Sequence, residues 1–333
     1  MGLFLSGDEI ISASGLTNVA VVLSSSDIYN IQSTPTLARS PYSTFITIPS
    51  SFATDLSGNA IQQVYDSAAL IVTTYTSYTL PIPLISVAVN VDQKAIVLTY
   101  ADLVDLSTID VTQLTLSSSS SPSSNLQDVS YTLQKTSVPQ LSAGFAYDVG
   151  IQLSDSDLNA MEYSRPLLSD LYHTFTSTTP SFAYSSFGNS LQAANTFPAA
   201  SFVPNYTPAR LVQFEIDLSK LELSLNISLA IDSTTIDLTK VTLQSAATRR
   251  FGSFLTLSPE GCMVNTLPSA DCNVINIVLS SQIVDQMRVL GIARTSATAY
   301  LTLDAYFALD FYGVPVAPVY DGSILGKYIL CFL

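Results

Sequence analysis

Short stretches of this chain alternate apolar and polar residues with a period of two. Leu84–Asn90 and Leu211–Asp217 are clear examples. This period matches a β-strand that buries one face and exposes the other. Ser, Pro, Asn and Gly separate the stretches, as they separate the strands of β-sandwiches. The pattern therefore predicts an all-β fold of sandwich domains.

An internal repeat organises the predicted strands. Leu84 and Leu211 stand 127 positions apart, and the segments 107–116 and 234–243 are similar at the same spacing. Because the two segments share both their residues and their alternating frame, chance is a poor explanation. A repeat of this length accommodates a β-sandwich domain with one short helix.

The C-terminal part of the repeat, which we call its back half, occurs three times. Each occurrence has a short strand ending in Ser and then a helical pattern, with helices expected at 27–31, 157–161 and 283–287. The predicted domains are a partial first β-sandwich repeat with its connector at 1–83, a second repeat at 84–210 and a third at 211–333.

The first repeat holds only a back half, because residues 1–83 contain nothing that corresponds to the opening strands at 84–116. Two explanations are open. Either a longer protein is cut inside a repeat, or a neighbouring molecule supplies the missing strands. We favour the cut as the expectation from sequence.

Two segments rich in Thr, Pro, Ala and Tyr join the repeats, at 62–83 and 190–210. Proline fixes the backbone angle φ and cannot donate a hydrogen bond to a sheet ladder. We therefore expect short, stiff connectors or edge strands, and a rod of linked domains.

Composition narrows the functional classes. Only 11% of the residues are charged, the net charge is −14, and there are 12 Lys and Arg residues. So few scattered cations do not make the basic stripe that a nucleic-acid partner requires. An apolar content of 47% argues against a disordered acidic chain. No stretch reaches the roughly 18 apolar residues of a membrane span.

Candidate catalytic and cofactor-binding groups are few. His173 is the single histidine, and a loop pair with Asp170 is a simpler interpretation than a catalytic triad. Phosphate-binding glycine motifs are missing from the sequence. Asp55, in the Asp-Leu-Ser-Gly-Asn sequence of 55–59, indicates a turn rather than a calcium ligand, because the middle repeat lacks this Asp. We therefore predict no enzyme activity, no metal and no cofactor.

Two glycosylation sequons and a cysteine pair indicate an extracellular location. The sequons begin at Asn205 and Asn226. Cys262 and Cys272 flank a stretch that suits a disulfide-closed loop, although two buried free thiols are the alternative. Cys331 is left over, free or paired outside this chain.

The repeat resembles the Ig-like repeats of very large extracellular proteins of protists, including the building blocks of mastigonemes, the hairs on flagella. The carriers of the resemblance are the segments 235–243 and 300–303 and the turn at 55–59, of which the middle repeat keeps only Gly188 and Asn189. The resemblance implies tandem Ig-like β-sandwich domains in a non-enzymatic structural glycoprotein. Its partners would be copies of itself in a filament and covalently attached glycans. The alternative is a cell-surface adhesin or carbohydrate-binding module.

Overall fold

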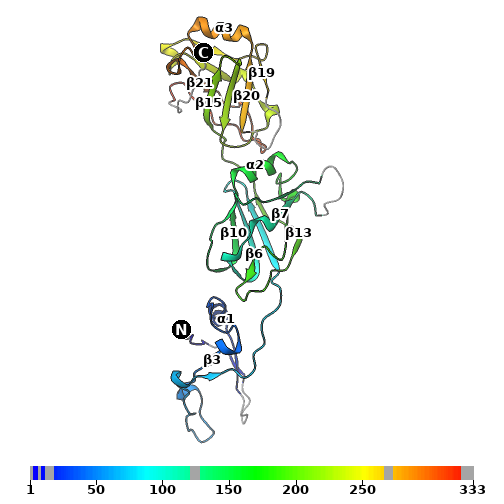
Figure 1. Cartoon of the computed structure of the whole chain (residues 1–333), viewed down its shortest axis with the longest axis vertical. Helices are drawn as coiled ribbons and strands as arrows, with labels where there is room; N and C mark the ends of the chain where they lie inside the picture. The colour runs from blue at the N-terminus through cyan, green and yellow to red at the C-terminus, as the bar shows by residue number, and fades with distance from the viewer. Residues whose placement is uncertain (1–2, 7–8, 12–18, 121–127, 266–272, 324–333) are drawn as a thin grey trace.

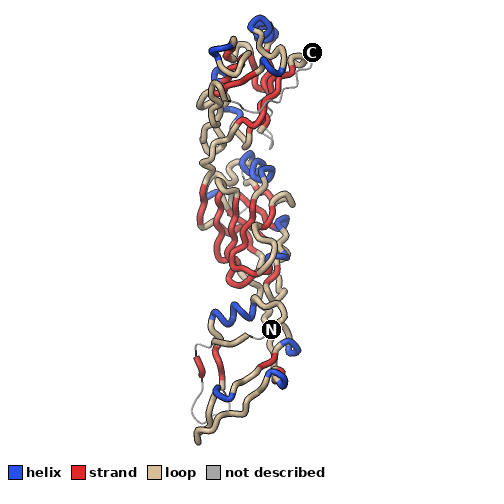
Figure 2. The backbone as a smooth tube through the Cα atoms, turned by 90° about the vertical axis from the view of Figure 1, so that its left-hand side faces the viewer, coloured by secondary structure: helices blue, strands red, loops and turns tan. Residues whose placement is uncertain are grey.

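The computed structural model describes residues 3–6, 9–11, 19–120, 128–265 and 273–323. In this part of the chain the first repeat (1–83), the middle repeat (84–210) and the third repeat (211–333) follow one another along a single long axis (Figure 1). Figure 2 shows the same elongated arrangement after a quarter turn. The molecule is therefore a row of units rather than a sphere.

The middle repeat consists of two sheets and one helix. The first sheet has the order β14 (Ser201–Val203), β5 (Leu84–Asn90), β6 (Ala95–Asp105), β10 (Phe145–Gln152) and β9 (Val138–Pro139), with β12 (Tyr184–Ser185) also paired to β6. The second has the order β13 (Ala194–Pro198), β11 (Phe175–Thr178), β7 (Leu114–Ser117) and β8 (Ser130–Thr132). Helix α2 (Asp155–Tyr163) follows β10. Only the β14–β5 pair is parallel among these strands.

The described part of the third repeat has counterparts of the strands from β5 to β11 and of α2, in the same order. One sheet contains β15 (Leu211–Asp217), β16 (Glu222–Ile227), β20 (Val274–Leu279) and β19 (Cys262–Val264), and the other contains β18 (Phe254–Thr256), β17 (Val241–Gln244) and β21 (Tyr300–Leu303). Helix α3 (Ser281–Leu290) follows β20 as α2 follows β10. The predicted spacing thus recurs in the elements themselves.

The first repeat contains counterparts of the back-half elements. Strand β1 (Glu9–Ile11) pairs with β2 (Ala20–Val22), helix α1 (Ser25–Gln32) follows, and β3 (Phe45–Ile46) pairs with β4 (Leu70–Ile71). These correspond to β9, β10, α2, β11 and β13 of the middle repeat. Among the described residues no strand lies on the second edge of β2 or of β3.

Short 3-10 helices recur at corresponding places, and aspartates cap five of the ten in the described part of the chain. They are η1 (Pro41–Ser43), η2 (Ser50–Phe52), η3 (Asp66–Ala68), η4 (Leu106–Thr108), η5 (Val111–Gln113), η6 (Leu171–His173), η7 (Ser233–Thr235), η8 (Leu238–Lys240), η9 (Arg249–Phe251) and η10 (Ser296–Thr298). Asp110 and Asp237 each accept a hydrogen bond from the backbone N–H two residues later, as N-cap residues do. The repeated Thr-Ile-Asp sequence therefore specifies a capped turn that leads into β7 or β17.

The alternating pattern buries one face of each strand. In β5, Val87 and Val89 are buried, whereas Ser86 and Ala88, which alternate with them, are only partly buried. Phe182 and Phe307 occupy corresponding places in two separate cores, one in the middle repeat and one in the third. Each of these two repeats therefore encloses its own apolar interior between two sheets.

The observed architecture confirms the predicted all-β class and the three predicted short helices. Strands β4, β13 and β14 lie in the segments predicted as connectors. The Ig-like assignment and the role of these segments as stiff connectors stay predictions. In the described part of the chain, no helix combines the length and apolar character that crossing a membrane requires.

Candidate interaction sites between repeats

The contact between the middle and third repeats forms at the end of α2. Asn159 is buried there, and its Oδ1 accepts a hydrogen bond from the backbone N–H of Ala230 at 3.2 Å. The Arg165 guanidinium donates to the carbonyl oxygen of Phe311 and lies 4.9 Å from the centroid of the Tyr312 ring. A cation above an aromatic face is attracted by the ring quadrupole. Arg165 thus links the helix end of one repeat to a turn of the next.

Two buried carboxyl groups face each other across this joint. Glu162 and Asp310 are both 4% exposed. Burial and, to a smaller extent, the Asp310 charge raise the pKa of Glu162 to about 8, against the opposing charges of Arg165 and Lys94. Asp310 instead has hydrogen-bond donors, because Asn205 Nδ2 donates to its Oδ2 at 2.7 Å. At neutral pH Glu162 is therefore largely protonated beside an Asp310 group that accepts hydrogen bonds.

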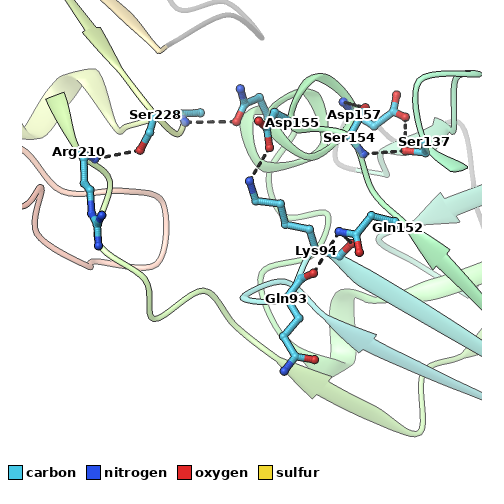
Figure 3. A network of polar contacts seen from close by, with 11 residues as sticks. Gln93, Lys94, Ser137, Gln152, Ser154, Asp155, Asp157, Arg210 and Ser228 are labelled. Atoms are coloured by element: carbon cyan, nitrogen blue, oxygen red, sulfur yellow. Dashed lines mark hydrogen bonds and ion pairs between the residues drawn. The ribbon is translucent and has the colours of Figure 1, made fainter. Parts of the chain in front are cut away.

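A polar network fixes the start of α2 (Figure 3). Ser154 Oγ accepts from the backbone N–H of Asp157 at 3.1 Å, and the Ser154 N–H donates to Ser137 Oγ at 2.9 Å. Ser137 Oγ in turn donates to the buried Asp157 carboxylate. Lys94, in the loop between β5 and β6, pairs with Asp155 at the first turn of the helix. These contacts fix the start of α2, whose Asn159 contacts the third repeat.

The contact between the first and middle repeats forms at the end of α1. The Tyr29 ring stacks on the Tyr147 ring with centroids 6.5 Å apart. Gln32 Nε2 donates to Asp102 Oδ2 at 3.1 Å. The Arg39 guanidinium lies 4.1 Å from the centroid of the Phe187 ring. Helix, arginine and aromatic ring therefore meet here as they meet at the other joint.

The two joints use corresponding positions. Gln32 and Glu162 each lie eight residues after the Ser that caps their helix. At the second joint Tyr312 of the third repeat donates to the carbonyl oxygen of Leu168 in the middle repeat at 2.8 Å, whereas Tyr75 donates to the Ala38 carbonyl oxygen inside the first repeat at 2.7 Å. Ala38 and Leu168 share a positive φ of 53° and 54°. The two joints therefore share corresponding positions at the helix end of one repeat and on the turn of the next, although the individual contacts of these residues differ.

The predicted sequons lie in different surroundings. Asn226 lies on β16 between β15 and β20, half-buried, with buried neighbours on both sides along the strand. Asn205 is buried, and its Nδ2 donates to Asp310 and to the Thr207 carbonyl oxygen. A glycan on that nitrogen would require the Asp310 bond to break, so the fold disfavours modification of Asn205. Glycosylation of Asn226 and Asn205 stays a prediction.

The cysteines give less information. Cys262, on β19, is a buried free thiol, and burial raises its pKa. Cys272 and Cys331 lie outside the described residues. The predicted Cys262–Cys272 disulfide therefore stays a prediction.

The groups considered for catalysis or metal binding have structural partners. His173 Nδ1 lies 2.9 Å from Asp170 Oδ1, and this same oxygen caps η6. Asp55 Oδ1 accepts from the backbone N–H groups of Ser57 and Asn59, which confirms the turn interpretation. Among the described residues, no group of three or more His, Cys, Asp or Glu side chains is placed to hold a metal ion.

Sequence reasoning missed the residues of both joints. Glu162 and Arg165 come just after the predicted helix, and their sequence context looks like that of exposed surface residues. No local pattern indicates that the next repeat will bury the Glu162 carboxyl group. One signal was present, because Phe187 and Tyr312 each precede a turn glycine at corresponding places. Comparing aromatic positions between the repeats would have found them.

Comparisons with known proteins identify no family. No family model and no curated protein matches this chain. A solved structure, the N-terminal part of the bacterial S-layer protein SbsC, is 12% identical over 61% of this chain, with a TM-score of 0.21. The match spans 44% of that S-layer chain. A similarity this low carries no argument about fold or function.

Proposed function

We propose that this chain is a non-enzymatic structural glycoprotein subunit of an extracellular filament or cell-surface appendage. The carrying observation is the joint that occurs twice with corresponding residues. In Figure 1 the helices α1, α2 and α3 each lie at the end of their repeat that points toward the third repeat or beyond it. A contact that is repeated in one direction builds a rod with two different ends, which is the geometry of a polar filament.

The two ends of the rod expose the groups that the joints use. At α3, Asp285 and Arg288 correspond to Asn159 and Glu162, and their side chains are 70% and 65% exposed. Val289 beside them is 83% exposed and lines an open hollow with Leu255. We call this surface the α3 pole. At the other end, the turn at 55–59 corresponds to the turn that carries Tyr312.

Head-to-tail stacking of copies places the α3 pole of one molecule against the 55–59 turn of the next. The low charge of the chain supports this arrangement, because a dispersed rod needs surface charge to stay apart. A glycan at Asn226 would cover part of the remaining surface. The internal repeat of the sequence and the two joints support this function, and neither argument requires a catalytic site.

The test is assembly of the purified chain, followed by sedimentation velocity and negative-stain electron microscopy. We expect end-to-end oligomers that grow with concentration, and we expect Val289→Asp to abolish them because it places a charge on the α3 pole. Val138→Asp is the matched control, because it places the same charge on an exposed valine of β9 in the middle repeat, outside the α3 pole. A chain that remains monomeric at high concentration, or equal behaviour of the two variants, would contradict the proposal. Binding to a glycan array by the monomer would favour the adhesin alternative instead.

A further inference from the structure

The first repeat exposes residues that are core residues in the other two repeats. Val21 and Leu23, on and just after β2, are each 37% exposed. Their counterparts in the middle repeat, Ile151 and Leu153, are 0% and 3% exposed. In the third repeat the corresponding residues, Ile277 and Leu279, are also buried. The strand is the same, so its side chains are exposed because no other strand among the described residues covers them.

The same contrast holds on helix α1 and in η2, the 3-10 helix that follows β3. Ile28 of α1 is 42% exposed, whereas its counterpart Leu158 of α2 is 2% exposed. Phe52 is 39% exposed, whereas Phe182 and Phe307 at corresponding places are fully buried. We call the surface formed by Val19, Val21, Leu23, Ile28, Ile46 and Phe52 the open face.

The middle and third repeats show what covers these positions. Strand β6 pairs antiparallel with β10, from Asp105 opposite Phe145 to Ala95 opposite Gln152. Strand β7 pairs antiparallel with β11, and β16 and β17 make the same pairs with β20 and β21. All of these covering strands belong to the front half of a repeat, the segment that corresponds to 84–117. In the described part of the first repeat, β2 pairs only with β1 and β3 pairs only with β4.

We propose that the open face is a binding site for the front half of a repeat of this same type. Two antiparallel strands add to β2 as β5 and β6 add to β10, and a third strand adds to β3 as β7 adds to β11. The backbone groups on the free strand edges supply the register, as in β-augmentation. Alternating apolar residues, like those of β5 and β7, supply the hydrophobic contact.

The chemistry of the open face favours this occupant over others. The side chains of the open face are aliphatic or aromatic. Along the chain they are spaced like residues on one face of a strand and one face of a helix, and not like those of a flat patch. The same spacing receives front-half strands in the two neighbouring repeats. The inference is separate from filament formation, because a front half can bind the open face whether or not the α3 pole binds another molecule.

The test adds a front half to the whole chain. A second copy of residues 84–117 is fused ahead of Met1 through a flexible Gly/Ser linker of roughly a dozen residues. Hydrogen–deuterium exchange then follows the backbone amides of β2 and β3. We expect exchange there to slow by at least about tenfold, toward the rates of β10 and β11. Binding of an apolar dye to the chain should fall at the same time.

The matched control carries Asp in place of the added copy's residues that correspond to Leu98 and Leu116, both fully buried in the middle repeat. It should leave exchange in β2 and β3 fast. Equal exchange in the fusion and its control would overturn the proposal. The proposal would also be overturned if the β2 amides of the unfused chain exchanged slowly and this protection were lost on dilution to monomer. The occupant would then be the open face of a second copy.

A second variant guards against a fusion that is merely misfolded. Val21→Asp in the fused chain should restore fast exchange in β2 while β10 and β20 keep their protection. If β2 stays protected in this variant, apolar contact at the open face is not what binds the front half, and the proposal is wrong. The fusion, its control and the Val21→Asp variant are measured as monomers that carry the Val289→Asp substitution, so a failure of filament assembly does not affect their results, and only the unfused chain is also followed through dilution.

Discussion

The first and middle repeats contain the same back-half elements but only the middle repeat encloses a core. Both helices begin after a capping Ser, and both have a buried Asp three residues later, Asp27 in α1 and Asp157 in α2. Yet Phe52 is 39% exposed where Phe182 is fully buried. Short-range signals therefore specify the elements, whereas burial depends on strands that are distant in sequence. Four experiments test this difference.

The largest effect should come from truncating the corresponding phenylalanines. Phe182→Ala leaves a cavity in the middle repeat and should lower its free energy of unfolding by about 3–5 kcal/mol. Phe52→Ala removes a partly exposed ring and should cost less than about 1 kcal/mol. Denaturant unfolding of each variant, read by amide exchange in each repeat, measures both, with Phe307→Ala as control for the third repeat. An equal cost at Phe52 and Phe182 would mean that the open face is covered.

The second effect is a pH dependence of the free energy of unfolding that differs between the two joints. Glu162 has its pKa raised to about 8 by burial from an ordinary value of 4.5, whereas its counterpart Gln32 does not titrate. Between these two pH values the folded chain binds more protons than the unfolded chain, so the free energy of unfolding falls as pH rises from about 4.5 to about 8.

Glu162→Gln should remove this dependence, which is on the order of a few kcal/mol across the interval. Urea unfolding of the middle repeat at several pH values measures it. Gln32→Glu is the complementary variant, and it should introduce a similar pH dependence at the first joint. A flat pH profile in the unmodified chain would show that the Glu162 carboxyl is not buried at the joint in solution.

The third effect concerns the arginine–aromatic contacts. Arg165→Ala and Arg39→Ala each remove a cation from an aromatic face and should weaken their joint by about 1 kcal/mol. Small-angle X-ray scattering should then show a broader distribution of end-to-end distances. Arg165→Lys keeps the charge but loses the planar group, so it should restore the rod only partly. An unchanged distribution in both alanine variants would indicate that the connectors alone set the geometry.

The smallest effect is local to a turn. The hydrogen bonds from Asn59 hold the pKa of Asp55 below its ordinary value. Asp55→Ala should speed exchange of the Ser57 and Asn59 amides without changing the melting temperature of any repeat. Ser185→Ala is the matched variant in the middle repeat, because Ser185 Oγ accepts from the Asn189 N–H at 3.0 Å. Loss of thermal stability in the Asp55 variant would reveal a wider role for this turn.

Residues that are close along the chain specify the local structure of this protein. Alternation placed Leu84–Asn90 and Leu211–Asp217 in strands, and the capping residues Ser24, Ser154 and Ser280 start the three helices where the helical patterns begin. The spacing of 127 residues also predicted that the third repeat would copy the middle one. These features follow from interactions between residues that are close along the chain, so a single sequence contains them.

Contacts between segments remote in sequence set which of these residues are buried and which groups cover them. The same pattern yields a core at Ile151 and an exposed edge at Val21, because the covering strands are remote in sequence. Asn205 looks like any sequon until Asp310 of the next repeat binds its amide. Glu162 becomes a proton-binding group only when the third repeat packs over α2. Burial and pKa are properties of the assembled neighbours, which no local pattern records.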